Sequence, residues 1–496
     1  MRKKIDINAK VAFNNQVDLC VGTGRMGLAL QKEYMEQLKY VQEGIGFTYI
    51  RGHGLFSDDM AIFQTYEEDG EEKDEYNFTY LDLVMDGYRD VNIKPFLELG
   101  FMPDKLASGE QTIFYWKGNV TPPKSYVRWQ NLITATLNHL IDRYGLEEVL
   151  TWPIEVWNEP NLPGFWKGAD MEEYFKLFEA SFNAIKAIDN RFRVGGPAIC
   201  GVKDELWIDE FMKFITHKQL KVDFISRHHY TTAEHTMKGH YSYAALEDPE
   251  FRFNNLKTTR QIVDSYEDYK GIPIYITEYN TSYCPDNVIH DMNLNAAYLA
   301  HHLSRIGDDT DMYSYWTFGD IFEERGVPFT PFYGGFGMVA NGSIPKPTYY
   351  TFEFYKGLKG ECVYRDDDCI VTKDEDGTIK AIAWNVCEDR MAMKDKELNL
   401  SLNLPASEYS IITKTVDEKC CNPLKLWYDI GQPSSLSKED KKLLREAAVP
   451  LVESDSVKVN DNGLDYTGII GPNGVVYIEI KPVNRSCDRG YEYPLI

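Results

Sequence analysis

The feature that most constrains the fold of this chain is a regular alternation of short apolar runs and amphipathic stretches between residues 17 and 359. The amphipathic stretches are helical in pattern: in residues 126–145 apolar side chains recur three and four positions apart, and Gly145 follows as a stop. Eight strand–helix units in one span predict an α/β fold, a closed (β/α)8 TIM barrel. The eight apolar runs are VDLCVGTG (17–24), FTYIRGHG (47–54), NIKPFLEL (92–99), PIEVWNEP (153–160), FRVGGPA (192–198), VDFISRHHY (222–230), PIYITEYN (273–280) and MYSYWTFG (312–319).

The pattern changes after about residue 359 and becomes that of a β-rich domain. Residues 369–386 indicate a hairpin with an Asp-Gly turn, and residues 473–482 indicate a further strand. The segment 437–448 predicts one short helix, and the alternation in KIDINAKVAF predicts an N-terminal strand. We therefore expect three parts: residues 1–14 with a strand that joins the C-terminal domain, a catalytic barrel over residues 15–358, and a C-terminal β-sandwich domain with a short helix over residues 359–496.

The charge and the cysteines restrict the partners and the compartment. A formal net charge of −24 repels nucleic acid and anionic membranes. The densest acidic run, residues 67–75, is expected to be a solvated loop or helix face. No run approaches 18 apolar residues, and the charged first ten residues lack the apolar segment of a signal peptide. Nine cysteines without metal-type spacing favour reduced thiols, so we expect a cytoplasmic protein.

One motif suggests a different function and has to be weighed. GTGRMG (22–27) matches the G-x-G-x-x-G fingerprint of dinucleotide sites. Such a site also needs an acidic residue at the end of the second strand, to hold the ribose hydroxyls. That strand ends with Arg51 and His53 instead. A nucleotide-dependent oxidoreductase is therefore disfavoured, and we expect the glycines to shape the first loop at the active face of the barrel.

Two glutamates stand out where chemistry occurs in such barrels, at the C-terminal ends of the strands. Glu159 ends the fourth predicted strand, and Pro160 has no N–H with which to extend the ladder. Glu278 ends the seventh strand, three units later, so the two should face each other across the barrel mouth. Either glutamate alone could be a structural carboxylate bonded to backbone or to arginine. Two of them in these positions favour a catalytic pair.

Two facing carboxylates suit glycoside hydrolysis. One is a protonated acid for the leaving oxygen, and the other is an anion for the positive charge that develops on the sugar. Asn158 fits as a donor to the 2-hydroxyl of the sugar, a contact that strengthens in the transition state. No H-E-x-x-H motif occurs, and neighbouring His228 and His229 should point to opposite sides of a strand, so no metal site is expected. Two carboxylates and positioning need no cofactor.

The motifs VWNEPNL and ITEYNTSY resemble those of the clan A retaining glycosidases, with glutamates on strands four and seven. A fuller set, residues 47–60, 76–103, 224–230 and 316–326, is similar to family 39 of the glycoside hydrolases, the β-xylosidases. The resemblance covers about residues 11–355 well and the C-terminal domain loosely. It implies Glu159 as acid/base and Glu278 as nucleophile. It also implies a sugar-binding set made of His53, Asn158, Phe165, His228, Tyr230, Trp316, Glu323 and Glu324.

The sequence is also compatible with structural roles for these residues. His53 and His228 could be core or loop histidines whose hydrogen bonds are made within the protein, and Trp316 could be an ordinary core residue. Glu323 and Glu324 could belong to a solvated loop, or their carboxylates could bind vicinal hydroxyls. Tyr230 could simply pack, or its hydroxyl could stabilise the Glu278 carboxylate.

The sequence thus predicts a retaining exo-glycosidase that releases xylose from the non-reducing end of β-1,4-xylo-oligosaccharides. The first alternative is the same machinery acting on an α-L-iduronide, an α-L-arabinoside or a β-glucoside; iduronate would need a cation, for which Arg51 is the one candidate. The alternative of another class is a non-catalytic carbohydrate-binding barrel, although both glutamates are present. The resemblance also implies a homo-oligomer such as a tetramer, with a small oligosaccharide as substrate. The net charge and the lack of a long apolar run argue against a nucleic-acid or membrane partner.

Overall fold

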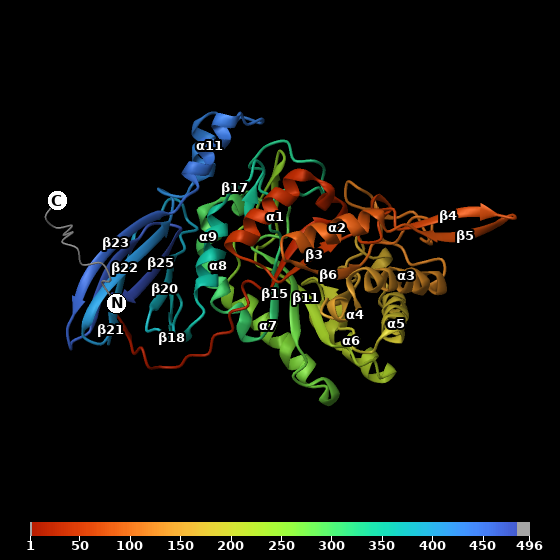
Figure 1. The fold of residues 1–496 in the computed structure, drawn as a ribbon, viewed down its shortest axis with the longest axis horizontal. Helices are drawn as coiled ribbons and strands as arrows, with labels where there is room; N and C mark the ends of the chain where they lie inside the picture. The colour runs from red at the N-terminus through yellow and green to blue at the C-terminus, as the bar shows by residue number, and fades with distance from the viewer. Residues whose placement is uncertain (1, 484–496) are drawn as a thin grey trace.

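The computed structural model describes residues 2–483, and it consists of a barrel joined to a β-sandwich (Figure 1). Eight parallel strands close into a ring in which spatial order follows chain order. Each of them coincides with one of the eight predicted runs, with β2 and β10 extending one residue beyond theirs, so the predicted TIM barrel is confirmed. The strands are β2 (Cys20–Arg25), β3 (Tyr49–His53), β6 (Lys94–Leu99), β9 (Ile154–Val156), β10 (Val194–Ile199), β11 (Phe224–Tyr230), β14 (Ile274–Asn280) and β15 (Met312–Tyr315).

Helices surround the barrel and bury their apolar faces against it. The predicted helix at 126–145 is α3, which begins after Ser125, whose side chain accepts from the Arg128 backbone N–H, and ends at Gly145 with φ 89°. Its Trp129 is fully buried and donates to Ser181 of α5 at 2.8 Å. The barrel helices are α1 (Lys32–Gly44), α2 (Thr79–Asp90), α3 (Tyr126–Tyr144), α4 (Leu146–Val149), α5 (Met171–Ile188), α6 (Asp204–Lys218), α7 (Pro249–Asp264), α8 (Asn293–Leu303) and α9 (Pro347–Gly357).

The C-terminal region forms two facing sheets, as predicted. The six-stranded sheet has the order β18-β19-β20-β25-β22-β23, and the three-stranded sheet has the order β1-β21-β24. Ile5, Leu400, Ile411 and Ile478 belong to the core that the two sheets share. The strands are β1 (Lys3–Ile5), β18 (Glu361–Arg365), β19 (Cys369–Lys373), β20 (Ile379–Asn385), β21 (Lys396–Leu402), β22 (Ser407–Val416), β23 (Leu451–Val459), β24 (Leu464–Ile470) and β25 (Gly474–Pro482).

The N-terminal strand β1 belongs to this sandwich and not to the barrel. It pairs in parallel with β21, with Lys3 opposite Leu400. The region also carries α11 (Lys438–Ala447), at the predicted position, and a second short helix, α10 (Pro423–Asp429), that the sequence analysis did not predict. Residues 484–496 of the expected C-terminal domain lie outside the described residues.

The barrel and the sandwich are packed against each other through α8 and α9 (Figure 1). Phe354 of α9 stacks on Tyr477 of β25, with ring centroids 5.4 Å apart. Asn293 at the start of α8 donates to the backbone oxygen of Asp417 at 2.9 Å. Because α8 directly follows the loop after β14, the sandwich supports the part of the barrel that carries Glu278.

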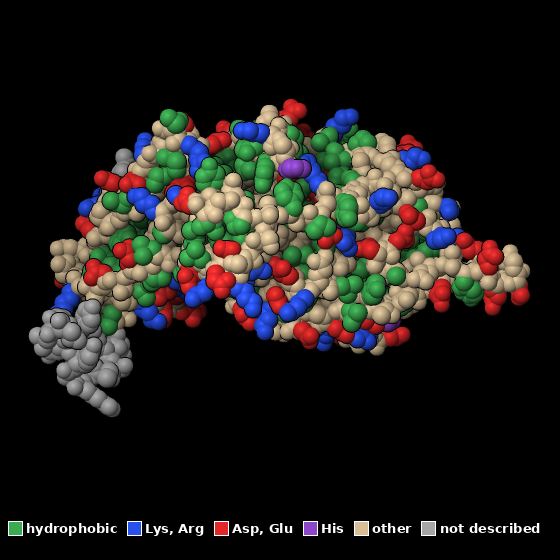
Figure 2. All heavy atoms as spheres, turned by 90° about the horizontal axis from the view of Figure 1, so that it is seen from above, with side chains coloured by type: hydrophobic (Ala, Val, Ile, Leu, Met, Phe, Trp, Pro, Cys, Tyr) green, Lys and Arg blue, Asp and Glu red, His purple; other side chains and the backbone are tan. Residues whose placement is uncertain are grey.

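Four hairpins extend the barrel loops. One of them replaces the solvated loop or helix predicted for residues 67–75: β4 and β5 pair there and project from the molecule (Figure 1). The turn has positive φ at Asp69 and Gly70, the geometry of a two-residue hairpin turn. Exposed glutamates cover its end (Figure 2). The hairpins are β4 (Phe63–Glu68) with β5 (Glu71–Tyr76), β7 (Thr112–Ile113) with β8 (Gly118–Asn119), β12 (Thr236–Lys238) with β13 (Tyr241–Tyr243), and β16 (Val339–Ala340) with β17 (Ile344–Pro345).

The glycines of GTGRMG serve packing around the first barrel strand. A Cβ atom on Gly22 would lie 2.3 Å from the Trp316 ring, and one on Gly24 would lie 3.0 Å from Leu28 and Phe322. Gly22 therefore lets the Trp316 ring lie directly against β2. This contact explains the glycine at position 22 without a nucleotide.

The helices and the cysteines of residues 2–483 bear on membrane insertion and on disulfide bonding. No helix of residues 2–483 has the length and apolar character needed to cross a membrane. The cysteines within this range are free and form no disulfide.

A buried lysine orders the long loop after β15. Lys346 is fully buried, and its Nζ lies 2.6 Å from an Asp291 oxygen and 2.7 Å from an Asp320 oxygen. It also donates to the backbone oxygen of Gly335 at 2.8 Å. Asp320 in turn accepts from the backbone N–H of Gly337 at 2.7 Å. One cation therefore ties together the two ends of this loop, which passes over the barrel mouth.

Lys346→Met should destabilise the protein by about 3–5 kcal/mol, because it leaves two buried carboxylates without their cation. The measurement is the midpoint of urea unfolding followed by circular dichroism. The matched control is Lys39→Met, which removes a lysine whose side chain is 68% exposed and should cost no more than about 0.5 kcal/mol. Equal midpoints for the two variants would contradict the structural role of Lys346.

Candidate active site

A cavity of about 370 Å³ opens at the C-terminal face of the barrel. It brings together both predicted catalytic glutamates and the predicted sugar-binding residues except Glu323. The predicted residues that line it are His53, Asn158, Glu159, Phe165, His228, Tyr230, Glu278, Trp316 and Glu324.

Glu159 lies in a turn beyond its strand, and not at the strand end as predicted. The strand β9 stops at Val156, and both Trp157 and Glu159 have positive φ, 73° and 45°. Neighbouring segments hold this uncommon backbone: the Glu159 N–H donates to Ala198 O at 2.9 Å, and the Trp157 indole donates to Phe165 O at 2.8 Å. The turn aims the Glu159 carboxyl group into the cavity.

Glu278 lies within β14 and accepts two strong hydrogen bonds, one on each oxygen. Arg51 Nη1 donates to Oε1 at 2.8 Å, and the Tyr230 hydroxyl donates to Oε2 at 2.8 Å. Both donors stabilise the ionised carboxylate. The sequence analysis allowed for this contact of Tyr230. Packing alone therefore does not describe what Tyr230 does in the structure.

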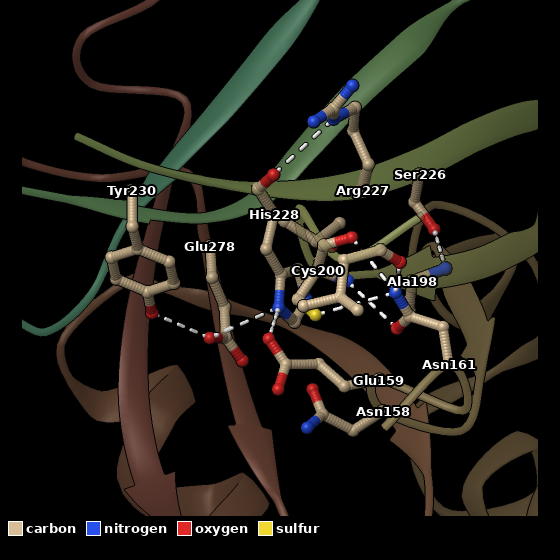
Figure 3. Close-up of polar contacts among 12 residues, drawn as sticks. Asn158, Glu159, Asn161, Ala198, Cys200, Ser226, Arg227, His228, Tyr230 and Glu278 are labelled. Carbon is tan, nitrogen blue, oxygen red and sulfur yellow. Dashed lines mark hydrogen bonds and ion pairs between the residues drawn. The ribbon is translucent and has the colours of Figure 1, made fainter. Parts of the chain in front are cut away.

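The two glutamates lie close together, with His228 between them (Figure 3). One oxygen of each carboxyl group and the His228 Nδ1 atom lie within 4.8 Å of one another. His228 Nδ1 is 2.8 Å from Glu159 Oε1 and 3.4 Å from Glu278 Oε2. This oxygen-to-oxygen spacing is closer to the about 5–5.5 Å between the carboxyl groups of a retaining site than to the about 6.5–9.5 Å of an inverting site.

The same three side chains have the ligand types and the spacing of a metal-ion site. A metal ion there would have to displace the hydrogen bond between His228 and Glu159. Burial lowers the pKa of His228 to about 4, so the imidazole is neutral at pH 7 and its Nδ1 either donates to or accepts from Glu159.

The environments of the two glutamates differ. Burial raises the pKa of Glu159 to about 7, and the nearby Glu98 charge adds to this effect. Burial, and not the charge of the facing Glu278, is the main cause of this raised pKa. A carboxyl group with this pKa is partly protonated at neutral pH, whereas Glu278 accepts hydrogen bonds from Arg51 and Tyr230.

His53 and Trp316 form one wall of the cavity. The His53 Nδ1 atom is 2.7 Å from Glu98 Oε2, and its Nε2 atom lies 3.6 Å from Glu278 Oε1. Burial by itself lowers the pKa of His53, but the Glu98 carboxylate outweighs it and raises that pKa above the usual value. The Trp316 ring lies 4.6 Å from the imidazole. The two rings offer one donor and one apolar face to a sugar.

The structure separates the Glu323–Glu324 pair. Glu323 points away from the cavity, where its oxygens accept from Arg25 at 2.6 Å and from Gln31 at 3.2 Å. Glu324 lines the cavity. Burial and the charges of Glu278 and Glu159 raise the pKa of Glu324 to about 8, so its carboxyl group can donate to a sugar hydroxyl at neutral pH.

Several lining residues were not predicted as site residues from the sequence, namely Leu162, Cys200, Gly201, Val202, Arg227, His229, Arg252, Tyr283 and Phe336. They lie in the loops that follow β9, β10, β14 and β15, within β11, or at the start of α7. The signal that could have found Tyr283 was its position five residues after Glu278. The others in the loops carry no polar pattern that distinguishes them from ordinary loop residues.

The barrel, with a glutamate on or after strands four and seven, defines the class of the protein as a glycoside hydrolase. The family model described as "Glycosyl hydrolases family 39" matches residues 3–463, and the chain belongs to this family. It is 48% identical over 479 residues to a "Beta-xylosidase" of Geobacillus stearothermophilus, covering 96% of this chain and 94% of that protein.

Two further relatives agree. A "Beta-xylosidase" of Caldicellulosiruptor saccharolyticus is 36% identical over 475 residues, covering 93% of this chain and 94% of that protein. A crystal structure described as a monomeric β-xylosidase from Caulobacter crescentus CB15 has a TM-score of 0.88 at 32% identity, covering 97% of this chain and 99% of that one. The predicted family and the predicted enzyme class are thus confirmed.

With Glu159 as the predicted acid, the pH profile of kcat/KM should have an alkaline limb near pH 7, because activity would then be lost as pH rises through the pKa of Glu159. In Glu159→Gln, assayed on a dinitrophenyl glycoside that needs no acid assistance, this limb should disappear. The control is Glu324→Gln, which removes the other titrating carboxyl group and should keep the limb. A limb that persists in Glu159→Gln and vanishes in Glu324→Gln would reverse the assignment.

Proposed function

We propose that the protein is a retaining exo-β-xylosidase that releases xylose from the non-reducing end of β-1,4-xylo-oligosaccharides. The observation that carries the proposal is the pair of glutamates within 4.8 Å, of which Glu278 is held by Arg51 and Tyr230 and Glu159 has a pKa of about 7. The high identity to two β-xylosidases over nearly the whole chain supports the substrate class.

In the first step Glu278 attacks the anomeric carbon while Glu159 gives its proton to the leaving oxygen, so a glycosyl–enzyme ester and a free alcohol form. In the second step Glu159, now ionised, takes a proton from water, and the hydroxide adds to the anomeric carbon. The ester bond breaks, and Glu278 is restored as a carboxylate. The sugar keeps its configuration because each step inverts it once.

Asn158 is oriented for the sugar by Arg51, whose Nη2 atom donates to the Asn158 amide oxygen at 3.0 Å. This bond fixes the amide so that its oxygen is used by the protein and its N–H groups are left for the 2-hydroxyl. His53, His228, Phe165, Trp316 and Glu324 complete the sugar site in this proposal.

The alternative glycosides fit less well. Iduronate carries a carboxylate, and Arg51, the cation that the sequence analysis named for it, is fully buried, bonded to Glu155, Glu278 and Asn158, and absent from the cavity lining. The arginines that do line the cavity, Arg227 and Arg252, are already paired with Asp204 and Glu247. The carboxyl groups of Glu159, Glu278 and Glu324 would repel a negatively charged sugar. A non-catalytic binding barrel would not need two glutamates in such different environments.

A panel of nitrophenyl glycosides tests the sugar. The aryl β-D-xyloside should be hydrolysed with a kcat/KM at least about tenfold above that of the β-D-glucoside, because a closed pocket around C5 clashes with a hydroxymethyl group. The released nitrophenolate is measured by absorbance. If an α-L-iduronide, an α-L-arabinoside or the glucoside is the best substrate, the proposed sugar is wrong, although the paired-glutamate mechanism stands.

Azide rescue tests the two roles. In Glu159→Ala, a dinitrophenyl xyloside should still form the glycosyl–enzyme, and azide should enter the vacated space and yield the β-xylosyl azide. In Glu278→Ala, turnover should fall by about four orders of magnitude or more, and azide should attack the substrate directly to give the α-xylosyl azide. NMR of the anomeric proton identifies each product. The opposite pairing of variant and product would exchange the two roles.

The assembly and the compartment belong to the same proposal. A homo-oligomer, such as a tetramer, is the expectation from the family resemblance, whereas one solved relative is described as monomeric. Cytoplasmic location is supported by the free cysteines among residues 2–483. The proposal includes the predicted boundaries of the catalytic barrel near residues 14 and 358. Light scattering of the purified protein measures the oligomeric state directly.

A further inference from the structure

The cavity is open on one side of the barrel. Among its lining residues, Val202 and Tyr283 are 49% and 51% exposed, and they follow β10 and β14. The strand β11 lies between these two in the ring. A leaving group that is protonated by Glu159 therefore has free space on the β10–β11–β14 side.

The opposite side carries a wall that is not part of the barrel. The loop after β6, residues 100–125, contains the hairpin of β7 and β8, with Phe114–Lys117 at its tip. The base of this hairpin is fixed to the loop after β9: Gln111 donates to Pro163 O at 2.7 Å, and the Lys167 N–H donates to Val120 O at 2.9 Å. The hairpin is thus attached to the segment that carries Glu159.

The tip of the hairpin is bonded to the loop after β15. The Tyr115 backbone N–H donates to the Glu324 backbone oxygen at 2.7 Å. In the ring, β15 and β6 are separated by β2 and β3. This hydrogen bond therefore closes the wall across the ends of two strands. It also fixes the backbone of Glu324, whose side chain lines the cavity.

Aromatic side chains of the tip fill the space behind the cavity. The Phe114 ring lies 6.0 Å from His53, nearly parallel to it, and 5.4 Å from Phe165, edge to face. The Trp116 ring lies 5.8 Å from Phe101, and a Cβ atom on Gly54 would be 3.2 Å from it. In contrast, the Tyr115 side chain is 60% exposed. The tip is held by its backbone bond and by two inward-facing rings.

We infer that the hairpin tip Phe114–Lys117, closed by the bond from Tyr115 N–H to Glu324 O, is the element that limits the cavity to one sugar unit. This inference rests on the proposed exo-xylosidase function. A sugar in the cavity directs its leaving group to the open side, so its non-reducing end meets this wall. A second unit on that end would occupy the space of the tip. The hairpin, and not the barrel, thus restricts cleavage to the terminal sugar unit.

Aryl β-xylobioside separates the two modes of cleavage. With the wall closed, the enzyme removes the terminal xylose first, and nitrophenol appears only after a second hydrolysis. With the wall open, a second sugar unit fits behind the cleaved one, and a single hydrolysis gives nitrophenol and intact xylobiose. Each hydrolysis consumes one water and breaks one glycosidic bond, so initial products report the mode directly by chromatography.

The main variant replaces Phe114–Lys117 by Asn-Gly, a two-residue turn that suits a hairpin and keeps the pairs of β7 with β8. Its initial ratio of xylobiose to xylose should rise at least about tenfold over the wild type. Its kcat/KM on the aryl xyloside should fall by about tenfold, because Glu324 loses its backbone anchor.

Two single variants isolate the bridge. Tyr115→Pro removes the N–H donor and should raise the xylobiose ratio in the same direction, by about threefold or more. Tyr115→Ala keeps the N–H, removes only the exposed side chain, and should behave as the wild type. Circular dichroism verifies the folding of all three variants. If the variant with the shortened hairpin does not fold, the product ratio of Tyr115→Pro tests the inference alone.

Exclusive release of xylose by the folded variants that lack the bridge would overturn the inference, and so would an open mode in Tyr115→Ala. Failure of the proposed function is distinct, because then the wild type itself would not hydrolyse the aryl xyloside.

Discussion

The active face depends on one buried guanidinium group. Arg51 comes from β3 and reaches residues of three other barrel segments: Glu98 on β6 at 3.0 Å, Glu155 on β9 at 2.6 Å and Glu278 on β14 at 2.8 Å. It is fully buried, so without these carboxylates its charge would be very costly, and without it they would be equally costly. Glu278 is therefore positioned by the same interaction that joins the strands, and stability and geometry cannot be changed separately at this point.

The barrel and its two glutamates could be predicted from the sequence because their signals are local and periodic. Each strand is a short apolar run, and counting units places Glu159 and Glu278 on opposite sides of a closed ring. The position of Glu159 beyond β9 could not be predicted, because the turn with positive φ at Trp157 is held by hydrogen bonds to other strands.

Other features were missed for equally physical reasons. The β4–β5 hairpin has little apolar alternation, since both of its faces meet solvent near the end, and its charges favoured a loop instead. Glu323 and Glu324 are adjacent and chemically identical, so only the position of Arg25 separates the structural one from the one in the cavity. The bond between Tyr115 and Glu324 joins two backbones and leaves no trace in the residue types.

The placement of β1 has a consequence for the order in which the chain is completed on the ribosome. Lys3 pairs with Leu400, so β1 must wait for a partner strand that is synthesised about 400 residues later. At about 5–20 residues per second, this delay is roughly 20–80 s. All eight barrel strands emerge within that time, whereas the sandwich cannot close its three-stranded sheet. The barrel can therefore form first, and β1 remains an unpaired strand until β21 has been synthesised.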